Sequence, residues 1–125
     1  MIDTHRLGIP ELRSAFSKGS LTPTAYVTQL LSRIERLNPR MKAFVEVDRA
    51  GALAAAAESD RRYKHDQQRP LEGIAMGIKA NIAVAGLELS AGMAARQGIV
   101  ADSDADVVAK LRSAGVVILG TLNMH

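Results

Sequence analysis

The feature that most constrains the fold is an alternation of strand, helix and strand patterns between residues 74 and 120. Residues 74–79 alternate large apolar with smaller side chains, and residues 116–120 form a short, almost wholly aliphatic run. The residues between them include a helical pattern over 102–114. Two strands joined through a helix favour a parallel pair with a right-handed crossover, so the sequence predicts an α/β fold.

The helix between these two strands has both ends marked in the sequence. Its expected end is Gly115, because glycine readily adopts the left-handed conformation that terminates helices. Acidic side chains complement the positive end of the helix dipole, and they crowd the expected start at Asp102, Asp104 and Asp106. The apolar stripe of this helix is expected to consist of Val107, Val108 and Leu111.

The first 65 residues read as a helical arm. A short helix is expected to begin at Pro10 and to stop at Gly19. A longer helix should begin with Thr22 as its cap, and Asn38-Pro39 is expected to end it. The arm therefore contributes amphipathic helices ahead of the strand–helix–strand unit.

A short strand and a third helix complete the arm. Residues 43–47 predict the strand, and Asp48 should cap an alanine-rich helix that runs to about Tyr63. The polar, proline-ended stretch His65–Pro70 reads as a surface loop. We therefore expect one domain over 1–125, in which the arm is followed by a unit over 70–125 that carries part of a mixed or parallel sheet flanked by helices.

Composition narrows the possible functions. The net charge is +3, but aromatic residues make up only 3%, so stacking platforms for nucleic acid are not expected. The chain has no cysteine, which excludes disulfides, a thiolate nucleophile and cysteine-bound metal. We find no leader segment, no apolar stretch of membrane-spanning length and no metal-ligand spacing, so the sequence predicts a cytoplasmic protein without cofactor or metal.

Lys79 is the residue with the clearest chemical interest, because it is the only cation between Arg69 and Arg96. In so apolar a segment, a lysine is either a stem that reaches water or a partly desolvated amine that can act as a base. Composition alone favours the first interpretation. Lys79 shares the small-residue face of its expected strand, which would let another group approach closely.

Three motif blocks resemble the amidase signature family. The central block is Pro70-Leu71-Glu72-Gly73-Ile74-Ala75-Met76-Gly77-Ile78-Lys79-Ala80-Asn81-Ile82, with Val84-Ala85-Gly86-Leu87 and Ser90-Ala91-Gly92 after it. The next runs from Asp104 to Arg112 and on through Val117-Ile118-Leu119-Gly120-Thr121-Leu122-Asn123-Met124-His125, and an upstream block, Ile34-Glu35-Arg36-Leu37-Asn38-Pro39 followed by Ala43-Phe44-Val45, is similar to the family's N-terminal arm. The blocks occur in the family's order, so the resemblance covers nearly the whole chain.

The resemblance implies a serine–serine–lysine triad in which Lys79 is the base. It also implies that both serines and the oxyanion hole lie in a later glycine- and serine-rich stretch, so the 125-residue chain is expected to be inactive alone. Two positions depart from the family pattern. Ala80 and His125 stand where aspartate is usual, and Ala80 bears on how Lys79 is oriented.

The function implied by the resemblance is hydrolysis of a small-molecule amide. The expected partners are the missing C-terminal part of the domain and, as an open option, a second copy in a homodimer. One alternative is the glutamine-hydrolysing subunit of a tRNA-dependent amidotransferase, and another is a non-catalytic fragment or interaction module. Asn123 and Met124 follow the last strand and are candidates to line the site, although loop and core contacts explain them equally well.

Two other groups of residues receive ordinary interpretations. Ser90 is expected to form a turn rather than to act as a nucleophile. The histidines, His5, His65 and His125, are widely separated and are interpreted as surface residues.

Overall fold

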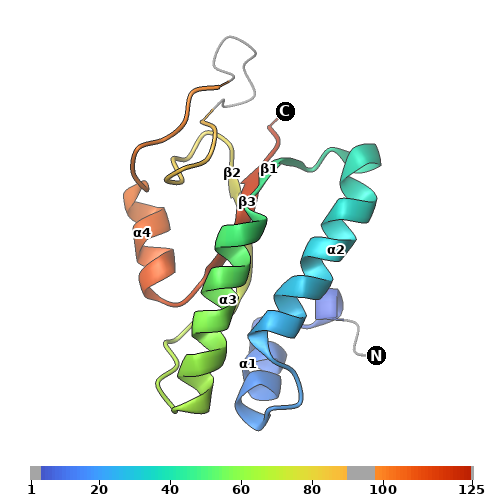
Figure 1. Cartoon of the computed structure of the whole chain (residues 1–125), viewed down its shortest axis with the longest axis vertical. Helices are drawn as coiled ribbons and strands as arrows, with labels where there is room; N and C mark the ends of the chain where they lie inside the picture. The colour runs from blue at the N-terminus through green and yellow to red at the C-terminus, as the bar shows by residue number, and fades with distance from the viewer. Residues whose placement is uncertain (1–3, 90–97, 125) are drawn as a thin grey trace.

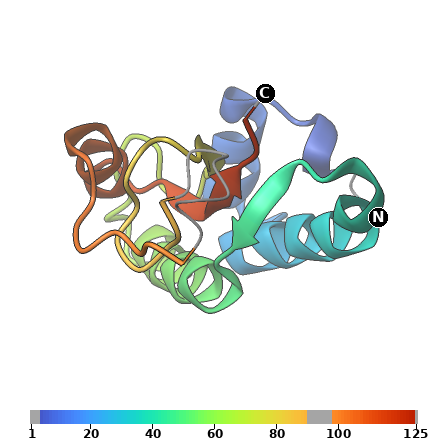
Figure 2. The ribbon, with the colours of Figure 1, turned by 90° about the horizontal axis from the view of Figure 1, so that it is seen from above.

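In the computed structural model, which describes residues 4–89 and 98–124, helices cover both faces of a small central sheet. Figure 1 shows this arrangement, and Figure 2 shows it from above. The elements are η1 (Thr4–Arg6), α1 (Ile9–Lys18), α2 (Pro23–Met41), β1 (Phe44–Val47), α3 (Arg49–Lys64), β2 (Ala75–Lys79), α4 (Asp106–Ser113) and β3 (Val117–Leu122). Among the described residues, no helix is both long enough and apolar enough to cross a membrane.

The sheet has the strand order β1-β3-β2. The predicted parallel pair is confirmed, because β2 runs parallel to β3 with Lys79 opposite Leu122. β1 is antiparallel to β3, so the sheet is mixed and β3 is its central strand. Gly120 makes this pairing possible, since a Cβ atom there would lie 2.1 Å from the Glu46 carbonyl oxygen.

Most helix ends follow their sequence signals. Gly19 terminates α1 in the left-handed conformation (φ 76°). The hydroxyl of Thr22 accepts the Ala25 N–H at 3.1 Å, and the carboxylate of Asp48 accepts the Gly51 N–H at 3.1 Å. The predicted caps of α1, α2 and α3 are therefore confirmed.

The predicted end of α2 at Asn38-Pro39 is wrong, because the helix continues to Met41. Pro39 lies in the last turn, where its missing N–H and its ring disturb few of the hydrogen bonds of the helix. The actual stop is Lys42, which is left-handed (φ 51°) and donates its N–H to the Asn38 carbonyl at 2.7 Å. The Asn38 side chain also bonds both backbone groups of Phe44, at 2.8 and 3.2 Å, and so turns the chain directly into β1.

Two apolar clusters lie on opposite faces of the sheet. Val117 and Leu119 belong to the larger one, which joins α1, α2 and α3 and includes three packed aromatic rings, Phe16, Tyr26 and Tyr63. Ile118 belongs to the smaller one, to which α4 contributes Val108. Val107 was expected in the α4 stripe but is 51% exposed, because at this point of the short helix its direction is away from the sheet.

Candidate functional site

The candidate site lies where β2 and β3 end. Since these strands are parallel, their carboxyl ends meet at one edge of the sheet, and Figure 1 shows residues 80–89 beyond that edge. Lys79 is the last residue of β2. The next residue, Ala80, is fully buried and donates its N–H to the Leu122 carbonyl at 3.0 Å, which fixes the strand ends to each other.

The side chain of Lys79 is exposed. Its strand neighbour Ile78 is buried, and alternation along β2 directs Lys79 to the opposite face. The close approach expected on the small-residue face is present at Gly77, where a Cβ atom would lie 2.9 Å from Cδ2 of Leu122. The desolvation that the apolar sequence suggested for Lys79 is not provided by the described residues, because Lys79 is exposed at the end of β2.

Asn123 makes loop contacts through its backbone N–H and its side-chain amide. Its backbone N–H donates to the Ala43 carbonyl at 2.8 Å, and its side-chain amide donates to the Lys42 carbonyl at 3.1 Å. Its side-chain oxygen accepts the Met124 N–H at 2.9 Å. These bonds attach the end of β3 to the link between α2 and β1, next to the strand edge that carries Lys79.

Hydrogen bonds to Asp104 fix the polypeptide that follows Lys79. The carboxylate of Asp104 accepts the Ala85 N–H at 2.8 Å and pairs with Arg112 at 3.0 Å. Of the acidic residues predicted to crowd the start of α4, Asp106 occupies the first turn, whereas Asp104 serves as this anchor instead. Ser90 and His125 lie outside the described residues.

A buried carboxylate that the sequence did not reveal lies away from this edge. Glu72 is fully buried and accepts hydrogen bonds from Arg69 Nε at 2.7 Å, Arg69 Nη2 at 2.9 Å and the Ser59 hydroxyl at 2.6 Å. Burial raises the pKa of Glu72, but the hydrogen bonds from Arg69 and Ser59 outweigh burial, and its net pKa lies below the usual value. Because these contacts join α3 to the connection before β2, the cluster is structural.

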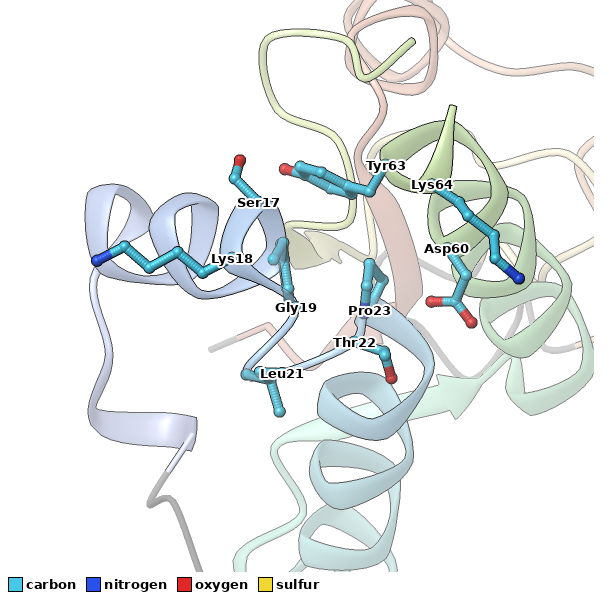
Figure 3. A pocket seen from close by; sticks show the side chains of 10 residues that line it. Ser17, Lys18, Gly19, Leu21, Thr22, Pro23, Asp60, Tyr63 and Lys64 are labelled. Carbon is cyan, nitrogen blue, oxygen red and sulfur yellow. The ribbon is translucent and has the colours of Figure 1, made fainter. Parts of the chain in front are cut away.

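The pocket in Figure 3 lies between α1, the start of α2 and the end of α3. It has a volume of about 450 Å³ and is lined by Phe16, Ser17, Lys18, Gly19, Leu21, Thr22, Pro23, Asp60, Tyr63 and Lys64. Asp60 is engaged by Thr24, whose N–H it accepts at 2.9 Å and whose hydroxyl it also binds. The carboxylate of Asp60 in this pocket is therefore engaged at the start of α2.

Within the described residues, no group of three or more His, Cys, Asp or Glu side chains is placed to hold a metal ion. His5 and His65 are both exposed, as expected. The described polar side chains near the strand ends include the Lys79 amine and the Asn123 amide.

Comparison with known proteins identifies the class. The family model described as Amidase matches residues 25–125, which is most of the chain. The chain thus belongs to the amidase signature family, as the motif blocks suggested.

Individual relatives agree with this assignment. The chain is 36% identical over 123 residues to a glutamyl-tRNA(Gln) amidotransferase subunit of Roseiflexus castenholzii and 37% identical over 115 residues to that of Myxococcus xanthus. These matches cover 98% and 91% of this chain and 25% and 24% of the relatives. The native peptide amidase of Stenotrophomonas maltophilia is 35% identical, with a TM-score of 0.91 over 98% of this chain and 26% of that one. The chain therefore spans about a quarter of the length of these relatives, and its fold is part of the amidase signature fold.

Proposed function

We propose that this chain contributes the lysine base to an amidase that hydrolyses small-molecule amides by serine acyl transfer. The observation that carries the proposal is the position of Lys79 at the carboxyl end of β2, beside β3 and inside the stretch that matches the family. Parallel strands of an α/β sheet characteristically present reactive groups at this edge.

The proposed chemistry uses Lys79 as a neutral amine. The amine accepts a proton from a bridging serine as that serine accepts one from the nucleophilic serine, whose oxygen attacks the amide carbonyl. The amine product leaves with a proton, and water then hydrolyses the acyl-serine to a carboxylic acid. Since Lys79 is exposed in the described chain, the reaction requires further polypeptide that carries the serines and covers this amine.

A second candidate is the glutamine-hydrolysing subunit of a tRNA-dependent amidotransferase. It is favoured by the names of the curated relatives, which include glutamyl-tRNA(Gln) amidotransferase subunits at 33–37% identity. It uses the same lysine but requires partner subunits. Co-purification with partners and glutaminase activity distinguish it from an independent amidase.

The first measurement is the intact mass of the source protein, with the coding sequence read past His125. The proposal expects a longer product with a glycine- and serine-rich continuation, amidase activity in that product, and loss of at least about 10³-fold in kcat in Lys79→Ala. Lys42→Ala is the matched control, because Lys42 is exposed in a loop and should leave kcat unchanged. Full activity in Lys79→Ala would refute the assignment. A product that truly ends at His125 would favour the third option, a non-catalytic interaction module.

A further inference from the structure

We propose that Glu46, on the edge strand β1, is a positioning residue that fixes the polypeptide following Lys79 at the strand ends. The inference rests on the function proposed above. It concerns a residue that no sequence motif singled out, since Glu46 reads simply as a polar position in a short strand.

The contact that carries the proposal joins two distant parts of the chain. The Glu46 carboxylate accepts the backbone N–H of Glu88 at 2.7 Å. Glu88 lies nine residues after Lys79, while the first residue after Lys79, Ala80, is held by the Leu122 carbonyl at 3.0 Å. The segment leaving Lys79 is therefore attached at both of its ends, and Glu46 supplies the attachment at Glu88 in addition to the Asp104 contact with Ala85.

Because of the strand order, this hydrogen bond connects β1 to the polypeptide that follows β2, a strand that is not its neighbour in the sheet. β3 lies between β1 and β2, with Glu46 opposite Thr121 and Lys79 opposite Leu122. A bond from β1 to the continuation of β2 thus bridges across the end of β3. An ionised carboxylate accepts a backbone N–H more strongly than a neutral carbonyl does, so the bridge is a strong one.

Glu88 also contacts a second segment, residues 98–100. Its own carboxylate accepts the Gly98 N–H at 3.0 Å, and it forms a β-bridge with Val100. The neighbouring Leu89 donates its N–H to the Ile99 carbonyl at 2.6 Å. A fixed Glu88 therefore also restrains residues 98–100. Through Glu88, the Glu46 side chain restrains both this segment and the one that follows Lys79.

The functional consequence follows from the sensitivity of catalysis to position. A shift of about 1 Å in a catalytic group can cost on the order of 10²-fold in rate. Because Asp104 still holds Ala85 when Glu46 is absent, loss of Glu46 should loosen the segment without unfolding the chain. Glu46 then affects the reaction through Lys79 and does not itself touch the substrate.

The structural half of the proposal is tested in the 125-residue chain by residue-resolved amide hydrogen exchange. In Glu46→Val, the Glu88 amide should exchange at least about tenfold faster, whereas Glu46→Gln, which keeps an acceptor oxygen, should stay within about threefold of the wild type. The control is Glu58→Gln, whose carboxylate engages Arg61 and Arg62 on its own helix and should leave the Glu88 amide unchanged. An unaltered exchange rate of the Glu88 amide in Glu46→Val overturns the proposal. If that variant does not fold, Glu46→Asp, whose side chain is one methylene shorter, replaces it, and an unaltered Glu88 exchange rate there overturns the proposal.

The functional half is tested in the longer, active protein. Glu46→Val should lower kcat about tenfold and change KM by less than about twofold, and Glu46→Gln should restore most of kcat. Lys79→Ala is measured in the same assay, so that failure of the proposed function can be distinguished from failure of the positioning role of Glu46. If Lys79→Ala keeps full activity, the proposed function fails and the exchange result still decides whether Glu46 holds Glu88. If Lys79→Ala is inactive but Glu46→Val keeps its kcat, the positioning role alone is overturned.

Discussion

Replacing Glu72 by glutamine should destabilise the fold at neutral pH. Each carboxylate oxygen of Glu72 accepts two hydrogen bonds: Oε1 accepts the backbone N–H and the Nε–H of Arg69, and Oε2 accepts Arg69 Nη2 and the Ser59 hydroxyl. The glutamine retains one carbonyl oxygen, so two of these four bonds meet an NH₂ group in either orientation of the amide. A hydrogen bond to a charged group contributes about 1.5 kcal/mol at the lower end, which gives a loss of about 3 kcal/mol. The Arg69 side chain is 31% exposed, so water screens the charge left behind and we add no separate cost for it.

Urea unfolding at several pH values measures this loss. Because the pKa of Glu72 is lower in the folded chain than its ordinary value of 4.5, the carboxylate stabilises the fold above pH 4.5 and loses this contribution as the pH falls through the folded pKa. The difference between the wild type and Glu72→Gln should therefore be full at pH 7 and shrink in more acidic solution. The control Glu35→Gln, at an exposed position on α2, should have little effect. A loss below about 0.5 kcal/mol at pH 7, or one that does not change with pH, would refute the reasoning.

Four further substitutions test the packing and the backbone contacts by urea unfolding. Gly115→Ala should cost more than about 2 kcal/mol, because φ is 100° and the new Cβ would lie 2.6 Å from Cα of Glu72, whereas Gly86→Ala, with φ 82° and open space, should cost only about 1 kcal/mol; equal losses would contradict this. Asn38→Ala should cost about 1–2 kcal/mol, since two hydrogen bonds to the backbone of β1 are removed, and an unchanged midpoint would show that they contribute nothing. Thr121→Val should be neutral or stabilise by about 1 kcal/mol, because the buried Thr121 hydroxyl has no partner among the described residues; a clear loss would mean that the hydroxyl is bonded.

Local signals in the sequence correctly predicted helix ends where a single residue determines how the helix begins or stops. Gly19, Thr22 and Asp48 mark helix ends by their own conformational or hydrogen-bonding preferences, and the structure has those ends. Pro39 was a misleading signal because a proline does not always end a helix. It removes one backbone N–H from the hydrogen bonds of α2, and the helix continues through it to Met41.

Contacts between distant residues were beyond the reach of sequence patterns. Glu72 lies in a motif block, yet nothing in the sequence indicates that Ser59, thirteen residues earlier, meets it in the interior. Glu46 and Glu88 are 42 residues apart and carry no shared spacing. Lys79 was found by its isolation among apolar residues, but its exposure depends on which face the tertiary structure covers, and local alternation does not determine that.

The strand order has a consequence for how the chain acquires its structure during synthesis. Among the described residues, β1 and β2 are not neighbours, and each is paired with β3, the last of these three strands to be made. Until Val117–Leu122 leaves the ribosome, both earlier strands keep unsatisfied edges that other chains can pair with. The helices of the arm can form early from local contacts, but formation of this sheet waits for β3. Nascent chains that end before Leu122 should therefore depend more on protection by chaperones than longer ones do.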